Sequence, residues 1–176
     1  MKYLWLDGMR TGELARLISL SENQLEDRPD QAYLAGLLHN MGLLIFMSRG
    51  CDKMERLIAL AKEDDGDLIQ FEADIFGFNR FEAAAYVLSL WKIPPRITEA
   101  ILLQNTPSKS DYDGVNALTA LHVAACLLKP PVMRESAGLF DMTLDADYLE
   151  RIKKFDRLPD WQILAEKVIK QYGGKA

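Results

Sequence analysis

The chain has 176 residues, of which 49% are hydrophobic and 27% charged, an ordinary composition for a single soluble globular domain. Its formal net charge of −5 argues against a nucleic-acid-binding domain, because contacts to phosphates need a clustered positive surface. The basic cluster near the C-terminus is interleaved with acidic residues, and we interpret it as the solvated face of a helix; it comprises Arg151, Lys153, Lys154 and Arg157.

Cysteine usage and hydropathy predict a cytoplasmic protein. Cys51 and Cys126 are the only cysteines, and each lies within a helical pattern. This usage fits reduced thiols in a cytoplasmic protein. Asp7, Arg10 and Glu13 interrupt the first residues, so the start lacks the apolar core of a signal peptide. No apolar run approaches the roughly 18 residues that cross a bilayer, and we therefore expect no membrane partner.

Helical periodicity dominates the sequence, and no segment shows the alternation of a strand. The first predicted helix carries its apolar stripe on Leu14, Leu17 and Ile18. A second begins with Asp30 as a candidate N-cap and runs without a break to Ile45. Because this second helix is apolar on nearly all sides, we expect it to form the buried centre of the fold.

Caps and helix breakers predict the remaining helices. Asp52 and Asn79 are candidate N-caps, and Pro95 suits the first turn of a helix. Trp5 and Trp91 are expected to fill the core between helices. After Gly50 the predicted helices cover 52–61, 68–76, 80–91, 96–103, 115–128, 147–155 and 159–172, and residues 131–147 are irregular. The fold class is therefore all-α.

Common catalytic and metal-binding motifs do not fit the sequence. His39 and His122 are the only histidines, and neither has a nucleophile motif nearby. Residues 8–12 lack the strand and the lysine of a phosphate-binding loop, and the cysteines lack CxxC spacing. The acidic run at 63–67 lacks the ligand spacing of an EF-hand and is predicted to be a turn. We interpret His122 as a packed helix histidine.

Two blocks of the sequence carry a more specific pattern. The first reads Ala-Gly-Leu-Leu-His-Asn-Met-Gly-Leu-Leu over residues 35–44. The second contains Glu72, Gly-Phe-Asn-Arg at 77–80, and then Trp91 and Pro94. Both blocks resemble the HDOD family, the "HD-related output domain" of bacterial signalling proteins, within the HD superfamily of metal-dependent phosphohydrolases. The first block is similar to the A-G-L-L-H-D-I-G-K-L signature of that superfamily.

The resemblance implies a compact helical domain of the HD-superfamily type. It extends over about Trp5 to Leu128, in the order and spacing of the family. We expect residues 1–176 to form a single domain, with a C-terminal helical extension over 129–176. The usual HDOD domain has further helices before the first block, and this chain is expected to lack some of them.

In catalytic HD enzymes, histidines and an aspartate bind one or two divalent metals, which activate a water to attack a phosphoester. The resemblance places the first histidine of the family near Asp7 and the signature pair at His39 and Asn40. It places another histidine at Arg80 and a frequent histidine pair near Gln104 and Asn105. His39 retains a ligand of the expected type, and the carboxylate near the start occupies the position of the first histidine. The candidate cleft comprises Asp7, His39, Asn40, Arg80, Gln104 and Asn105.

Two replacements in this set argue against a metal. The neutral amide of Asn40 cannot supply the charge of a bridging carboxylate, and Arg80 places a permanent cation where an imidazole would bind. We therefore expect no metal, no cofactor and no catalysis. His39 should donate to a backbone carbonyl or to Asp7, and Arg80 should pair with Asp7 or Glu82 or, alternatively, hold a phosphate.

These observations predict a non-catalytic signal-transduction domain that acts through a protein partner or through self-association. Two alternatives stay open at this point. One is a metal-dependent phosphohydrolase or phosphodiesterase with an atypical ligand set. The other is a sensor that binds a phosphorylated small molecule in the cleft, with Arg80 as its anchor.

Overall fold

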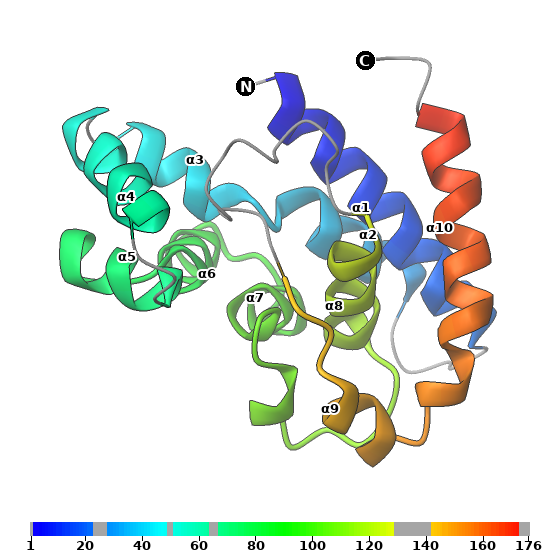
Figure 1. Ribbon diagram of the computed structural model, residues 1–176. Coiled ribbons are helices and arrows are strands. Elements are labelled where there is room, and N and C mark those ends of the chain that lie inside the picture. The colour runs from blue at the N-terminus through cyan, green and yellow to red at the C-terminus, as the bar shows by residue number, and fades with distance from the viewer. Residues whose placement is uncertain (1, 23–27, 49–50, 64–66, 129–141, 173–176) are drawn as a thin grey trace.

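The computed structural model describes residues 2–22, 28–48, 51–63, 67–128 and 142–172, and every regular element in these ranges is a helix (Figure 1). The fold is all-α, as predicted. In chain order the helices are α1 (Lys2–Ser21), α2 (Pro29–Leu38), α3 (Met41–Ser48), α4 (Cys51–Glu63), α5 (Leu68–Phe76), α6 (Arg80–Leu90), α7 (Pro95–Leu103), α8 (Ala117–Leu127), α9 (Ala146–Arg151) and α10 (Leu158–Tyr172). Two short 3-10 turns lie at Pro107–Lys109 and Phe155–Arg157. The predictions for Gly50, for the middle of the acidic run and for residues 131–141 lie outside the described residues.

The predicted caps are confirmed in part. The Asn79 side chain accepts from the backbone of Phe81 and Glu82, and Glu82 completes a capping box at the start of α6. Pro95 is the first residue of α7. Asp30 is not an N-cap, because α2 begins earlier, at Pro29, whose fixed φ suits a first helical position.

The predicted continuous helix from Asp30 to Ile45 is wrong, because the chain breaks into α2 and α3 at His39 and Asn40. In an unbroken helix the Gly36 carbonyl would accept from the Asn40 amide. It accepts instead from Nδ1 of the His39 imidazole, at 2.6 Å. The side chain of His39 therefore competes with the backbone at this turn.

The centre of the fold is α8 rather than the second predicted helix. Every residue from Ala117 to Ala124 is buried, and α8 contacts α1, α2, α7 and α10. Figure 1 shows α8 between α7 and α1–α2, with α4 and α5 on one side of the molecule and α10 on the other. Only part of α2 is fully buried, because its other face lies nearer the surface.

Exposure of two tryptophans contradicts the predicted core. Trp5 is 65% exposed and Trp91 is 61% exposed. The buried stripe of α1 passes through Leu4, Gly8 and Thr11, and Trp5 lies beside this stripe rather than on it. Trp91 ends α6 at the surface, just before a left-handed turn at Lys92. The tryptophan in the core is Trp161 of α10.

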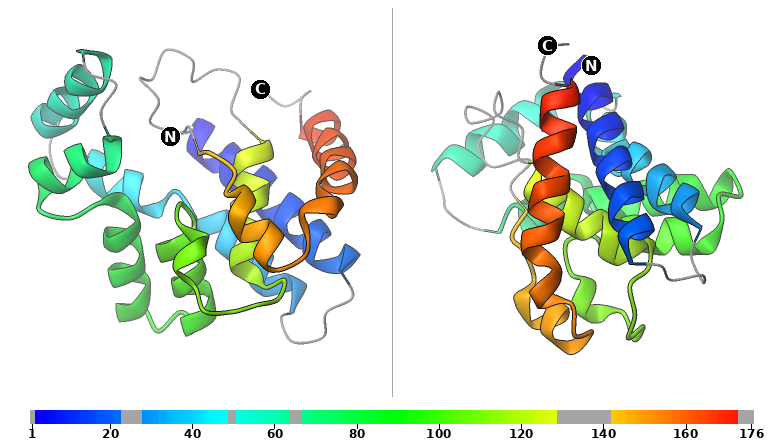
Figure 2. Two further views of the ribbon diagram at one scale, coloured as in Figure 1. Left: turned by 60° about the horizontal axis from the view of Figure 1, so that its bottom comes forward. Right: turned by 90° about the vertical axis from the view of Figure 1, so that its right-hand side faces the viewer.

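The basic cluster is not a simple solvated face, because two of its members hold the C-terminal helices to α1. Lys154 Nζ lies 2.6 Å from Oε2 of Glu22, and Arg157 Nε lies 2.8 Å from Oε1. Burial by itself would raise the pKa of Glu22, but these two hydrogen bonds lower it below its ordinary value. The second view in Figure 2 shows α10 running beside α1.

No described helix combines the length and the apolarity that spanning a bilayer requires.

Glycines allow α1 and α2 to approach each other closely. A Cβ atom on Gly36 would lie 2.5 Å from the Gly12 Cα, and a Cβ on Gly8 would lie 2.8 Å from the Leu37 carbonyl oxygen. Both obstacles are backbone, which cannot move aside as a side chain can. The two helices therefore approach at a distance that only glycine permits.

We expect Gly36→Ala to lower the free energy of unfolding by about 2–3 kcal/mol, because the added methyl group forces α1 and α2 apart. Urea unfolding followed by circular dichroism measures this change. The control is Gln162→Ala at an exposed position of α10, which should leave stability nearly unchanged. A Gly36→Ala protein as stable as this control would show that the helices are not in backbone contact.

Candidate functional site

Three of the predicted site residues meet between α1 and the α2–α3 turn. Asn40 Nδ2 donates to Oδ2 of Asp7 at 2.7 Å, and His39 Nε2 lies 3.4 Å from the same oxygen. The side chains of Asp7 and His39 are 13% and 7% exposed. We call these three residues the Asp7 cluster. Both expected partners of His39, a backbone carbonyl and Asp7, are present.

Gln104 joins the cluster through the backbone. It follows α7, is fully buried, and donates from Nε2 to the carbonyl oxygens of His39 at 3.2 Å and Ile101 at 3.0 Å. Gln104 therefore holds the α2–α3 turn against the end of α7. Asn105, its half-buried neighbour, takes no part in these hydrogen bonds.

Arg80 turns toward α5, away from the partners that we predicted. Its guanidinium forms a buried ion pair with Glu72, and its backbone N–H donates to Oε2 of Glu72 at 2.9 Å. The predicted pairing with Asp7 or Glu82 is therefore wrong. Glu82 is unsuitable because its Oε2 accepts from the Asn79 N–H in the capping box of α6.

The sequence holds a signal for this ion pair in the position of Glu72. Glu72 is 0% exposed and lies on the apolar side of α5, between Leu68 and Phe76 at helical spacing. A carboxylate on such a stripe needs a buried cation, because an isolated buried charge is strongly unfavourable. Arg80 is the first residue of α6 after the turn and supplies it.

More than half of the chain matches one known protein family. Residues 1–107, more than half of the chain, match the sequence model of the HDOD domain. The chain belongs to the HDOD family. No curated protein matched the whole sequence significantly.

Three solved structures share the fold of this HDOD domain. A "Putative phosphohydrolase" from Shewanella amazonensis has 22% identity and a TM-score of 0.63, covering 96% of this chain and 59% of its own. A "Putative signal transduction protein" from Marinobacter aquaeolei has 20% identity and a TM-score of 0.68, covering 97% and 38%. An "HDOD domain protein with unknown function" from Geobacter sulfurreducens has 21% identity and a TM-score of 0.61, covering 94% and 62%. The chain thus spans less than two thirds of each of these proteins.

The residues at the metal positions of this HDOD domain do not fit a metal. Oδ2 of Asp7 already accepts a hydrogen bond from Asn40, and the amide groups of Asn40 and Gln104 present N–H donors rather than ligand atoms. The described residues contain no group of three or more His, Cys, Asp or Glu side chains that could hold an ion. Hydrogen bonds therefore already engage Oδ2 of Asp7 and the side-chain N–H groups of Asn40 and Gln104.

His122 is the packed helix histidine that we predicted, and it also links three elements. Nδ1 donates to the Gln104 carbonyl at 2.7 Å, and Nε2 accepts from the backbone N–H of Asp145 at 2.9 Å. Asp145 then caps α9. Burial lowers the pKa of His122, although the Gln104 hydrogen bond and the charge of Asp145 oppose this effect.

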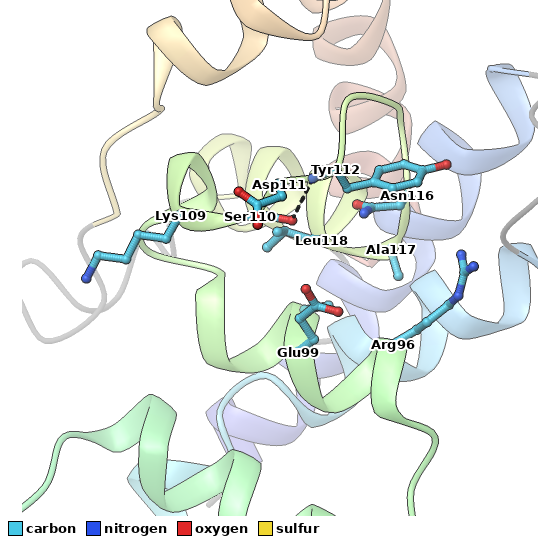
Figure 3. Close-up of a pocket in the computed structure, with 10 residues that line it drawn as sticks. Arg96, Glu99, Lys109, Ser110, Asp111, Tyr112, Asn116, Ala117 and Leu118 are labelled. Atoms are coloured by element: carbon cyan, nitrogen blue, oxygen red, sulfur yellow. Dashed lines mark hydrogen bonds between the residues drawn. The ribbon is translucent and has the colours of Figure 1, made fainter.

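A polar pocket that the sequence did not predict lies between α7 and the start of α8. It has a volume of about 450 Å³, and its lining carries charges of both signs. In Figure 3, Arg96 and Glu99 rise from α7 toward Tyr112 and Asn116, whereas Lys109 points away. The Asn116 side chain caps α8 at 3.0 Å from the Thr119 N–H, so this polar group already has a structural role.

We expect the Glu72–Arg80 pair to be strongly coupled. Arg80→Met should lower the free energy of unfolding by about 3–5 kcal/mol, because it leaves the buried Glu72 charge without its partner. The double variant, which carries both Arg80→Met and Glu72→Met, should lose much less free energy of unfolding than the two single variants lose together. Urea unfolding of all four proteins gives the coupling energy.

The control for that cycle is the Glu13–Arg16 pair on the surface of α1, whose Arg16 side chain is 38% exposed. Its coupling should be about 0–1 kcal/mol. Equal coupling energies for the two pairs would contradict a special role for the buried one.

We expect stability to fall as the pH drops below the ordinary His122 pKa of 6.5. The unfolded chain takes up a proton there, whereas the folded protein resists it, so the unfolded state gains relative stability. Unfolding free energies measured between about pH 7.5 and about pH 5.5 test this. His122→Asn should be less stable by about 1–3 kcal/mol at the higher pH and should depend less on pH.

The Asp145 carboxylate, which lies beside His122, does not account for this pH window. Burial would raise the pKa of Asp145, but hydrogen bonds from Ser108 and Tyr148 lower it below 3.8, so it stays charged throughout. A His122→Asn protein with the same slope as the original would show that another group titrates.

Proposed function

We propose that this HDOD domain is a non-catalytic regulatory module that acts through contact with another protein or with a second copy of itself. The observation that carries the proposal is the Asp7 cluster, in which Asn40 and His39 are directed at the Asp7 carboxylate. A metal-dependent enzyme needs that carboxylate and several imidazoles free to coordinate.

The charges near the Asp7 cluster also argue against a bound metal. Gly42 packs directly against the backbone of Arg80, which brings the start of α6 close to the α2–α3 turn. Asn40 contributes no negative charge to this region, whereas Arg80 contributes a permanent positive charge. Because Glu72 is committed to Arg80, it is not available as a replacement ligand.

The surface above the cluster is apolar, which argues against the phosphorylated-ligand alternative. A hollow of about 470 Å³ opens beside Asn40, and aliphatic or aromatic side chains form the rest of it: Leu4, Trp5, Leu37, Leu38, Met41 and Leu44. None of these side chains carries the positive charge that favours a phosphate, and Arg80 does not line this hollow. An apolar side chain of a protein partner suits it better, and Trp5 is exposed at its edge.

The related structures agree with a signalling role without establishing it here. One relative bears the name of a signal transduction protein and another that of a phosphohydrolase. Because this chain spans 38–62% of the three proteins, their roles apply to longer molecules. Action in the cytoplasm is likewise part of our proposal.

The decisive experiment measures metal and catalysis together. We expect protein incubated with excess Mn²⁺ and then desalted to retain far less than one ion per chain by elemental analysis. We also expect no hydrolysis of bis-p-nitrophenyl phosphate or of nucleotides with Mn²⁺ present. Retained metal at one ion per chain, or turnover that His39→Ala abolishes, would revive the phosphohydrolase alternative.

Sedimentation velocity tests whether the protein associates with a second copy of itself through the hollow beside Asn40. We expect association that grows with protein concentration and that Trp5→Ser weakens, because this substitution removes an exposed anchor at the hollow. Trp91→Ser is the matched control, since Trp91 is equally exposed but does not line the hollow. A monomer at every concentration would exclude self-association and leave a different protein as the partner.

A further inference from the structure

A second apolar pocket lies on another part of the molecule. It has a volume of about 720 Å³, within the range of small-molecule sites, and shares no lining residue with the hollow beside Asn40. The lining comes from α3, α4, α5, the α5–α6 turn and α6. We call it the phenylalanine pocket; its lining comprises Ile45, Phe46, Lys53, Phe76, Phe78, Glu82, Ala83, Tyr86 and Val87.

Aromatic rings give this pocket a rigid floor and an exposed rim. Phe46 is fully buried and stacks on Phe76, with ring centroids 4.0 Å apart and planes 4° from parallel. Phe78 lies 6.0 Å from Phe46 and is inclined by 44°. Phe78 is 43% exposed and Tyr86 is 66% exposed, so two rings on the rim still face solvent. A planar apolar group would cover them at little entropic cost to the protein.

Lys53 is the cation in the lining of the phenylalanine pocket. Lys53 Nζ lies 5.5 Å from the centroid of the Phe76 ring, where a cation–π contact places the ammonium group beside the floor. No described carboxylate forms an ion pair with Lys53. The acidic lining residue, Glu82, directs its Oε2 to the backbone N–H of Asn79.

We propose that the phenylalanine pocket binds a small planar aromatic anion, such as an aromatic carboxylate. The rings of the ligand lie against Phe78 and Tyr86, and its acidic group faces Lys53. A small molecule fits better than a protein surface, because the pocket is concave and its volume matches that of a drug-sized ligand. This inference does not depend on the proposed function, but it would give a regulatory domain an input site.

Occupation of this pocket would also stabilise part of the fold. Helices α4 and α5 pack on each other, and α4 also contacts α3. A ligand that touches Lys53 on α4, Phe76 on α5 and Tyr86 on α6 would tie these elements together. Because it binds the folded state, it must raise the apparent stability of the protein.

The test titrates the full chain with 2-naphthoate and follows binding by calorimetry and by amide NMR shifts. We expect saturable binding with shifts concentrated in residues 45–87, and weaker binding of the neutral analogue 2-naphthamide. Lys53→Met should weaken the binding of 2-naphthoate about three- to fivefold and leave the binding of 2-naphthamide unchanged, because it removes only the charge. Phe78→Ala should weaken the binding of both compounds about three- to tenfold.

Lys167→Met, at an exposed position of α10, is the matched control and should bind as the original protein does. Phe78 is partly exposed, and an unchanged melting temperature of Phe78→Ala without ligand would show that it folds. The proposal is overturned by an absence of saturable binding at millimolar 2-naphthoate, by equal affinity for the two compounds, or by binding that Lys53→Met and Phe78→Ala do not alter.

Discussion

The backbone contact between α1 and α2 is the constraint on which the rest of the structure depends. Gly12 and Gly36 lie so close that neither can carry a side chain without displacing the other helix. This approach brings Asp7 opposite the α2–α3 turn, 33 positions along the sequence from Asn40. The Asp7 cluster, the turn at His39 and the hollow beside Asn40 all follow from where these two helices cross.

Direct hydrogen bonds between buried polar groups join the helices around the site. Asn40 joins α1 to the α2–α3 turn, Gln104 joins that turn to α7, and the Glu72–Arg80 pair joins α5 to α6. Each link satisfies groups that would otherwise be unpaired and costly in the interior. These polar links therefore hold the site together from four separate helices and a turn.

The sequence predicted those features of the fold and of the site that depend on local signals. Asn79 and Pro95 marked the starts of α6 and α7, and the first block identified two residues of the Asp7 cluster. The sequence could not predict the features that depend on the angle between helices. The partner of Arg80 lies eight positions back across a turn. The apolar stripe around Glu72 indicates a buried carboxylate, but the crossing of α5 and α6 decides that Arg80 is the cation beside it.

Two other errors have equally physical causes. The break between α2 and α3 arises because an imidazole takes the Gly36 carbonyl, an outcome that hydrophobic periodicity does not report. Trp5 was assigned to the core because it is large and apolar. The buried stripe of α1 uses the small residues Gly8 and Thr11 instead, since α2 packs too close for a bulky ring.

The Glu72–Arg80 pair has a consequence for any attempt to build a metal centre into this domain. A histidine at position 80 would leave the Glu72 carboxylate stranded in the interior, and an aspartate at position 40 would set a second negative charge against Asp7, where the two groups are now 2.7 Å apart. Each substitution alone would therefore lower the stability of the fold. A designed metal centre would need several coordinated changes made at once.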